Sequence, residues 1–256
     1  MTRKPTHRPS CLIAGASSGI GRATAFALAE AGFDLFLLGR DARRLESARS
    51  ACEKSGAKAV AFRTDLERSG SSDEIFRSFD RTFSRLEGLV YSAGAYARQP
   101  LAKTTDADLE RMFRSNVAAP LALIRSAAPR LRQARGASSV IVSSTLGLRP
   151  VAGAAAYSLS KAAINSLAQC LAIEWGPMGI RCNAVCPGVV DTPIHDSTWS
   201  PKEKRRIFKE LAARLPSGRI GRPKDVAALI TYLVSPPSAW LTGALIPIDG
   251  GISLIG

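Results

Sequence analysis

Residues 11–21 read CLIAGASSGIG, an apolar run that ends in a turn rich in glycine. The glycines stand at Gly15, Gly19 and Gly21, and apolar residues then recur at helical spacing over Ile20–Ala31. A strand that passes through such a turn into a helix lets the backbone approach a phosphate, which then lies at the positive end of the helix. We interpret this stretch as the first strand, turn and helix of a nucleotide-binding fold.

Short apolar runs alternate with helical patterns along the rest of the chain. Asp41–Ser55 has the spacing of an amphipathic helix with Asp41 as its N-cap, and Ala154–Trp175 favours a long helix rich in alanine. This alternation predicts a single-domain α/β fold, a doubly wound parallel sheet with helices on both faces. The predicted strands are Cys11–Ala14, Asp34–Leu38, Ala59–Phe62, Leu86–Tyr91, Val140–Val142, Ile180–Cys186 and Ala244–Ile248.

Composition sets the broad class of the protein. Of 256 residues, 46% are hydrophobic and 22% are charged, which is typical of a globular protein. The absence of repeats and long linkers predicts one domain over residues 11–256, preceded by a basic tail at residues 1–10. No apolar run reaches the ~18 residues that a membrane span requires. Five cysteines favour reduced thiols and a cytoplasmic protein, and their spacing does not favour a metal site.

The charge of the chain is strongly basic. Lys and Arg number 35 against 21 Asp and Glu, and most of the excess lies in residues 1–10, 125–135 and 195–222. Such clusters indicate an acidic partner, either nucleic acid, an anionic substrate or an acidic protein, or else a solvated surface that maintains solubility. A basic nucleic-acid-binding protein is therefore one alternative function, although no nucleic-acid motif accompanies the charge.

The glycine-rich turn also matches a second motif. Residues 15–19 satisfy G-x-S-x-G, the turn that carries the nucleophile of α/β-hydrolases, with Ser17 as the nucleophile. In this chain the turn would follow the first strand, so that no earlier strand supplies the loop for an oxyanion hole. His195 is the one plausible base of the two histidines. A hydrolase that uses Ser17 is therefore the other alternative.

Tyr157 and Lys161 stand four residues apart in a helical stretch, which places both side chains on one face. A free tyrosine has a pKa near 10 and is a poor acid at neutral pH. We expect a nearby ammonium group, together with the positive charge of an oxidised nicotinamide, to lower that pKa toward the working range. Ser144 ends the predicted strand thirteen residues before Tyr157, where its hydroxyl could hold a substrate oxygen.

These motifs, in this order and spacing, resemble the short-chain dehydrogenase/reductase family, and the 3-oxoacyl-carrier-protein reductases within it. The resemblance runs from Cys11 to Gly251, although residues 91–94 read Tyr-Ser-Ala-Gly where the family usually has Asn-Asn-Ala-Gly. It implies a Rossmann-type fold, an NADP(H) cofactor and no catalytic metal. It is carried by Gly15-x-x-x-Gly19-Ile20-Gly21, Ser92-Ala93-Gly94, Asn116, Ser144, Tyr157-x-x-x-Lys161 and Pro187-Gly188.

The resemblance also implies a role for each matching residue. Tyr157 would be the catalytic acid and base, Ser144 would hold the substrate oxygen, and Lys161 would bind the ribose and lower the pKa of Tyr157. Asn116 would hold a water of a proton relay beside the lysine. The other implied cofactor-binding residues are Gly15, Ser17, Ser18, Gly19, Ile20, Gly21, Arg40, Asp65, Leu66, Ala93, Gly94, Pro187, Gly188, Val190 and Thr192.

The family resemblance further implies a substrate lid at about residues 192–219, in which His195 is one residue, and a homotetramer. In that tetramer the long helices around residues 104–134 and 154–176 would pair across a two-fold axis. The apolar run at Ala162, Ala163, Ile164, Leu167, Ala168 and Leu171 exceeds what one face of a helix needs.

Cofactor choice depends on the end of the second predicted strand, where an acid selects NAD and an arginine accepts the extra phosphate of NADP. Gly39 provides no carboxylate there, and Arg40 follows directly. We therefore expect an NADP(H)-dependent enzyme that reduces a small ketone or oxidises a secondary alcohol, with 3-oxoacyl thioesters among the candidate substrates. The alternative within the family is an NAD-dependent dehydrogenase of polyols, steroids or sugars. The substrate itself could be anionic or carried on another protein.

Overall fold

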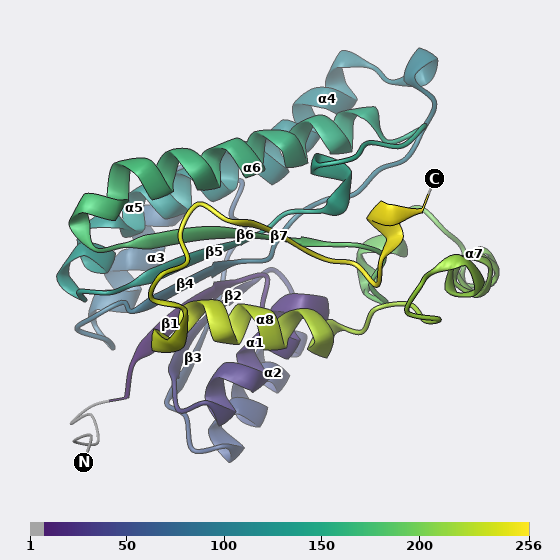
Figure 1. Ribbon diagram of the computed structural model, residues 1–256. Coiled ribbons are helices and arrows are strands. Elements are labelled where there is room, and N and C mark those ends of the chain that lie inside the picture. The colour runs from purple at the N-terminus through teal and green to yellow at the C-terminus, as the bar shows by residue number, and fades with distance from the viewer. Residues whose placement is uncertain (1–7, 256) are drawn as a thin grey trace.

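The computed structural model describes residues 8–255 of the chain, and a seven-stranded parallel sheet runs through it (Figure 1). The strand order is β3-β2-β1-β4-β5-β6-β7, so the order reverses between β1 and β4. All seven predicted strands are present, with bounds that differ by one or two residues. They are β1 Ser10–Ala14, β2 Asp34–Gly39, β3 Ala59–Arg63, β4 Gly88–Tyr91, β5 Ser138–Val142, β6 Arg181–Pro187 and β7 Leu245–Ile248.

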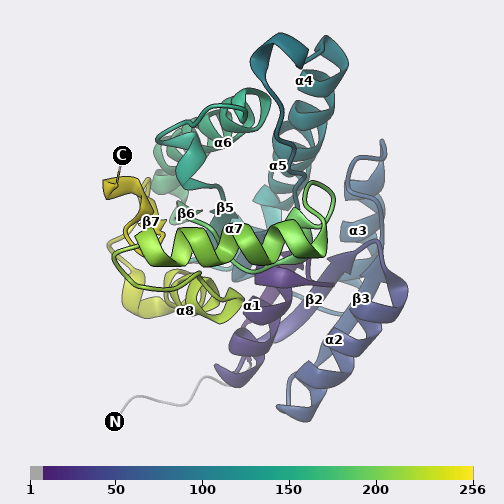
Figure 2. The ribbon, with the colours of Figure 1, turned by 90° about the vertical axis from the view of Figure 1, so that its right-hand side faces the viewer.

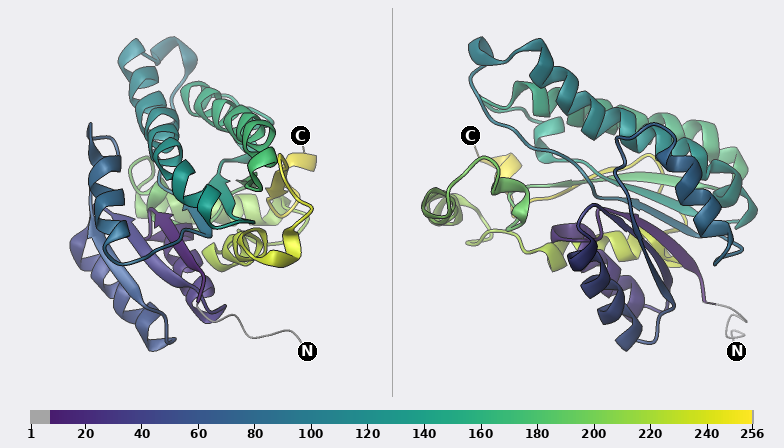
Figure 3. Two further views of the ribbon diagram at one scale, coloured as in Figure 1. Left: turned by 90° about the vertical axis from the view of Figure 1, so that its left-hand side faces the viewer. Right: turned by 180° about the vertical axis from the view of Figure 1, so that it is seen from behind.

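Two layers of helices enclose the sheet, and a further helix stands beyond one edge (Figures 1 and 3). Figure 2 shows this further helix, α7, lying across the edge at which the strands end. One layer contains α1 Gly19–Glu30, α2 Ala42–Lys54 and α8 Pro223–Val234, and the other contains α3 Ser71–Asp80, α4 Asp106–Phe113, α5 Ala119–Gln133 and α6 Ala155–Trp175, while α7 is Pro201–Arg214.

Alternate side chains of each strand feed two separate hydrophobic cores. On β1, Leu12 and Ala14 pack with α3, α5 and α6, whereas Cys11 and Ile13 pack with α1, α2 and α8. All four side chains are fully buried. A sheet that is apolar on both faces has to be covered on both. The predicted doubly wound fold is therefore confirmed.

The helix expected over residues 104–134 is interrupted. Helix α4 ends at Phe113, a π-helical turn follows over Arg114–Ala118, and α5 begins at Ala119. Pro120 has no backbone N–H, so it cannot donate the α-helical hydrogen bond to the carbonyl of Asn116 four residues earlier. A π turn accommodates this break, and such turns are frequent at functional sites.

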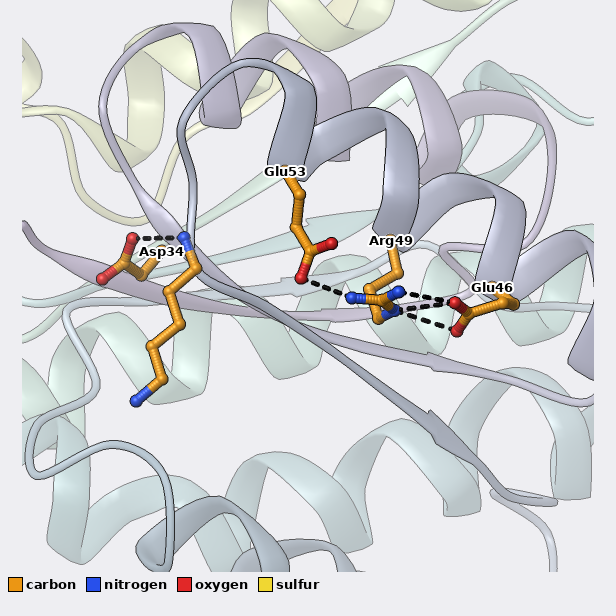
Figure 4. A network of polar contacts seen from close by, with 5 residues as sticks. Asp34, Glu46, Arg49 and Glu53 are labelled. Atoms are coloured by element: carbon orange, nitrogen blue, oxygen red, sulfur yellow. Dashed lines mark hydrogen bonds and ion pairs between the residues drawn. The ribbon is translucent and has the colours of Figure 1, made fainter.

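The predicted basic tail ends earlier than expected, because Ser10 already belongs to β1. Residues 1–7 lie outside the described part of the chain. Nε of Arg8 lies 3.2 Å from a carboxylate oxygen of Asp34, which also accepts a hydrogen bond of 2.9 Å from the amide of Lys58 (Figure 4). These contacts attach the first described residues to the edge of the sheet.

Figure 4 also shows Arg49 of α2 between two glutamates of the same helix, Glu46 and Glu53. The two glutamates are about half exposed and Arg49 is 28% exposed, and surface pairs at this spacing contribute about 0.3–0.5 kcal/mol each. These pairs therefore contribute little to the stability of the fold.

A buried guanidinium joins β6 to the C-terminal end of α8. Nη1 of Arg181 donates to the backbone oxygens of Leu233 and Ser238 at 2.9 and 3.1 Å, and Nη2 donates to that of Ser235 at 3.4 Å. The residue is 9% exposed. Carbonyls at a helix C-terminus lack intrahelical donors, so a cation placed there both satisfies them and interacts favourably with the helix dipole.

We predict that Arg181→Met lowers the free energy of unfolding by about 2–4 kcal/mol, because it leaves several buried carbonyls without a donor. Thermal denaturation followed by circular dichroism should show a midpoint lower by roughly 5–15 °C. Arg125→Met, at an exposed position of α5, is the matched control and should change the midpoint by little. An unchanged midpoint for Arg181→Met would contradict this account.

Candidate active site

A cavity of about 940 Å³ lies at the carboxyl ends of the strands, where the order of the sheet reverses. In doubly wound folds ligands bind at this reversal. All residues predicted for the site line the cavity except Gly21 and Asn116, which lie behind its wall. The structure therefore brings together residues from widely separated parts of the chain.

The glycine-rich turn forms one wall of the cavity through close backbone packing. Gly15 has a φ of +86°, and a Cβ built on it would lie 2.7 Å from the amide nitrogen of Ala93. A Cβ on Gly21 would lie 2.3 Å from the carbonyl oxygen of Gly15. Ser18 is the N-cap of α1, but its side chain makes no capping hydrogen bond. The backbone amides at the start of α1 are thus accessible to a phosphate, which fits a dinucleotide.

The end of β2 is lined by cationic side chains. Arg40 is exposed and lines the cavity beside Asp41 and Arg44. The carboxylate of Asp41 accepts from the backbone and side chain of Arg44, at 2.9 and 2.6 Å, and these bonds lower its pKa. Asp41 is therefore engaged with Arg44, and Arg40 has no ion-pair partner among the described residues. The arrangement fits an added phosphate group.

Tyr157, Lys161 and Ser144 meet at the floor of the cavity, and each is less than a tenth exposed. Nζ of Lys161 donates to the carbonyl oxygen of Val142, at the end of β5, over 3.0 Å and lies 5.6 Å from the ring centre of Tyr157. Oγ of Ser144 accepts from the amide of Leu146 at 3.1 Å, which fixes its position after β5.

Burial sets the pKa values of Tyr157 and Lys161 in the protein without a cofactor. It raises the pKa of Tyr157 well above its ordinary value, and the smaller opposing effect of the Ser144 hydroxyl does not reverse this. Burial also lowers the pKa of Lys161 to about 8. The lowering expected from the sequence included the charge of an oxidised nicotinamide, so it stays a prediction for the protein with its cofactor bound. A low-dielectric site disfavours phenolate and ammonium alike.

Asn116 is buried beneath the loop that follows β4. Its side-chain amide donates to the carbonyl of Ala95 and to the hydroxyl of Ser160, both at 3.0 Å, and its oxygen accepts from the amide of Ala95 at 2.8 Å. A Cβ on Gly94 would lie 2.9 Å from that oxygen. The side chain thus holds the loop in place, while Pro120 cannot donate to the backbone carbonyl of Asn116.

Five aromatic rings continue from Tyr157 into the segment predicted as a lid. Tyr96 contacts Tyr157 edge to face, with ring centres 4.9 Å apart, and contacts His195 in the same way at 5.4 Å. His195 stacks on Trp199 at 4.6 Å, and Phe208 of α7 completes the cluster. Burial lowers the pKa of His195, so its ring is neutral at pH 7. The structure places His195 as a packed residue of this aromatic cluster.

Lys204 fastens α7 to the segment that precedes it. Its ammonium group donates to the carbonyl of Thr192 at 3.1 Å and lies about as close to the carboxylates of Asp191 and Asp196. The other basic side chains of α7 before Arg214 do not line the cavity, so they face solvent. They are Lys202, Arg205, Arg206 and Lys209.

Several residues of the cavity were not identified from the sequence. Tyr96 and Arg98 follow β4, Arg149 follows β5, and residues 252–255 near the C-terminus close one side. For Tyr96 a signal was available, because it lies just beyond Gly94 at a strand end. For Arg98, Arg149 and the C-terminal residues no local pattern exists, because they are brought to the cavity by contacts with residues that are distant in the sequence.

The hydrolase alternative receives no support from the geometry. Ser17 lies against Gly39, where a Cβ would approach its oxygen to 3.1 Å, whereas His195 is packed among aromatic rings. No hydrogen bond joins Ser17 to His195. Within residues 8–255, no three His, Cys, Asp or Glu side chains are grouped as metal ligands, and no helix is long and apolar enough to cross a membrane.

Comparison with known proteins agrees with this geometry. A family model described as enoyl-(acyl carrier protein) reductase matches residues 15–253. The L-rhamnose 1-dehydrogenase (NAD(P)(+)) of Sphingomonas sp. (strain SKA58) is 33% identical over 243 residues, which cover 94% of each chain.

Two solved structures share the fold over almost their whole length. Levodione reductase superposes with a TM-score of 0.92 at 25% identity, covering 98% of this chain and 99% of that one. A short-chain type dehydrogenase/reductase from Mycobacterium marinum superposes with a TM-score of 0.88 at 27% identity, covering 96% and 95%. With its fold, its site and its sequence in agreement, the chain belongs to the short-chain dehydrogenase/reductase family of oxidoreductases.

Proposed function

We propose that this protein is an NADP(H)-dependent reductase of ketones that also oxidises the corresponding secondary alcohols. The observation that carries the proposal is the meeting of Tyr157, Lys161 and Ser144 at the floor of the cavity. The nicotinamide, when bound, supplies the hydride for reduction or accepts it in oxidation. The other step is a proton transfer to or from the substrate oxygen, and side chains of this protein carry it out.

The residues that we propose to hold the cofactor follow successive strands. The turn after β1 and the first amides of α1 would bind the pyrophosphate. Asp65 and Leu66, after β3, would contact the adenine, and Ala93 and Gly94, after β4, the adenine ribose. Lys161 would hold the other ribose, and the segment from Pro187 to Thr192, which includes Gly188 and Val190, would contact the carboxamide.

Tyr157 is suited to donate a proton. Because burial raises its pKa, the phenol is protonated at pH 7, which is the form that a reduction requires. As hydride reaches the carbonyl carbon, the carbonyl oxygen gains charge and takes the proton from Oη of Tyr157. Ser144 would hold that oxygen, and the ammonium group of Lys161 would stabilise the phenolate left behind.

The proton has to be replaced after each turnover. We propose that a water bound to the backbone carbonyl of Asn116 passes it toward Lys161, because Pro120 leaves that carbonyl without its helical donor. The amide side chain of Asn116 would maintain this arrangement through its bonds to Ala95 and Ser160.

The aromatic cluster limits the choice of substrate. Rings of Tyr96 and Trp199 above the phenol favour a flat or cyclic ketone over an extended acyl chain. A 3-oxoacyl thioester is therefore a second candidate substrate. An alternative function is that of an NAD-dependent sugar, polyol or steroid dehydrogenase, which the similarity to the rhamnose dehydrogenase favours.

We propose a cytoplasmic location on the free thiol state of all five cysteines.

Exposed apolar side chains support the proposed homotetramer. One patch on α4–α6 contains Leu159 and Ile173, which are 55% and 77% exposed, and another beside α8 contains Trp240, which is 98% exposed. Two separate patches suit two different two-fold interfaces, as in a tetramer. In the apolar run of α6, Ile164, Ala168 and Leu171 are buried in the core of the protomer, which leaves Ala162, Ala163 and Leu167 at least partly exposed for an interface.

For catalysis, Tyr157→Phe should abolish turnover and change cofactor affinity by less than about threefold, because it removes only the hydroxyl. A panel of ketones and alcohols, read by nicotinamide absorbance with both cofactors, measures the first effect, and fluorescence titration measures the second. Tyr232→Phe, on the exposed face of α8, is the matched control and should retain full activity. Turnover by Tyr157→Phe above a tenth of wild type would refute the assignment.

For cofactor selection, Arg40→Ala should weaken NADPH binding by roughly 10- to 150-fold, the worth of a charged hydrogen bond, and affect NADH much less. Arg43→Ala removes an equal charge that does not line the cavity, so its preference should stay that of wild type. Gly39→Asp combined with Arg40→Ala should reverse the preference, provided that Ser17 moves slightly to admit the new side chain. Equal efficiency of wild type with NADH and NADPH would disprove the argument.

For assembly, Ile173→Glu and Trp240→Glu should each convert tetramers into dimers, because each places a charge in one of the two proposed interfaces. Sedimentation velocity at micromolar concentration measures the species, with Lys209→Glu on the exposed side of α7 as the control. A monomeric wild-type protein would show that the patches do not pair.

A further inference from the structure

Arginines line both halves of the cavity, whereas the described carboxylates line only one. The half that follows β1, β2 and β3 contains all of its acidic side chains, Asp41, Asp65 and Glu67. The half that follows β4, β5 and β6, together with the lid, contains arginines and, among the described residues, no carboxylate. We proposed the first half for the cofactor, so the cationic half faces the substrate.

We infer that the substrate is a flat, apolar molecule with a ketone at one end and a carboxylate at the other, and that Arg98 and Arg149 bind that carboxylate. This inference rests on the proposed reductase function and names the class of molecule on which that function acts.

Arg98 lies next to the aromatic path that leads to the reacting phenol. It lines the cavity together with Tyr96, two residues earlier, and its Nη2 donates to the carbonyl oxygen of Ala152 at 3.3 Å. The Tyr96 ring in turn contacts Tyr157, with ring centres 4.9 Å apart. An anionic group bound at Arg98 would thus lie in the same cavity as the reacting phenol.

Arg149 reaches the same half of the cavity from β5. Its Nη1 donates to the carbonyl oxygens of Ser253 and Ile255, and thereby holds the C-terminal segment against the cavity. These partners are neutral. Its positive charge is therefore not compensated by the contacts that position it.

Several other arginines of the described chain form ion pairs with acidic side chains. Arg44, Arg130 and Arg219, for example, each form an ion pair, whereas Arg98 and Arg149 form none within residues 8–255. Arginine presents a planar fork that matches a carboxylate, and it attracts one more strongly when no protein acid competes. Two uncompensated guanidinium groups on one side of a cavity predict an anionic ligand.

The aromatic rings that line the same cavity define the rest of the molecule. Tyr96 and Trp199 present apolar faces within the cavity, and their edge-to-face packing leaves little adaptability for a branched or strongly hydrated chain. A ring that carries a ketone at one end and a carboxylate at the other satisfies both ends of this arrangement.

The test compares 4-acetylbenzoate with its methyl ester, which has the same ring and ketone without the charge. Dissociation constants are measured by calorimetry on wild-type protein loaded with NADP⁺, where no reduction takes place. The acid should bind at least about tenfold more tightly than the ester, and Arg98→Gln and Arg149→Gln should each reduce this ratio about five- to tenfold. Lys209→Gln removes a charge outside the cavity and should keep the wild-type ratio.

Equal binding of acid and ester, or no binding of either below millimolar concentration, would overturn the inference. So would a loss of preference in Lys209→Gln as large as in the arginine variants, since the effect would then come from overall charge. Turnover of neutral and anionic ketones is measured separately. No turnover of any ketone would contradict the reductase function, whereas efficient turnover of esters and acids alike would contradict only the carboxylate site.

Discussion

The backbone of Gly15 lies against the backbone of Ala93 more closely than any side chain would permit. This contact joins the turn after β1 to the loop after β4, at the point where the order of the strands reverses. Because Gly21 packs on the carbonyl of Gly15, the start of α1 is held at the same place. The cavity, the exposed amides of α1 and the loop above Asn116 all depend on this close approach.

Tyr157 and Lys161, which we propose as catalytic, are placed by the packing of a helix rather than by a loop. Helix α6 runs for 21 residues, and its buried side chains, among them Ile164 and Ala168, pack on the sheet. This packing keeps Tyr157 and Lys161 on the face that meets the end of β5. Burying an ammonium group is costly, and one hydrogen bond to Val142 offsets only part of the cost, as its lowered pKa indicates.

Helix α7, in the segment predicted as a lid, has fewer buried contacts than the floor of the cavity. Helix α7 has no buried residue, and it is held by the aromatic cluster and by the contacts of Lys204. Elements with few buried contacts open at a lower free energy than the core does. A rigid cavity beneath a loosely attached helix suits an enzyme that has to admit a cofactor and a substrate in turn. Arg98 and Arg149, in contrast, lie on loops that follow strands of the sheet.

The local pattern of residues was sufficient for the fold and for most of the site. Alternating apolar runs located every strand, and the glycine turn with Tyr157 and Lys161 located the cavity, because both signals lie within a few neighbouring residues. Other properties depend on contacts between residues that are far apart in the sequence. One example is the hydrogen bond from Arg149 to the carbonyl oxygen of Ser253, 104 positions away. The raised pKa of Tyr157, the burial of Ile164 and the unpaired charge of Arg98 are of this kind. Only the tertiary structure decided them, since burial and charge pairing depend on neighbours that the fold brings together.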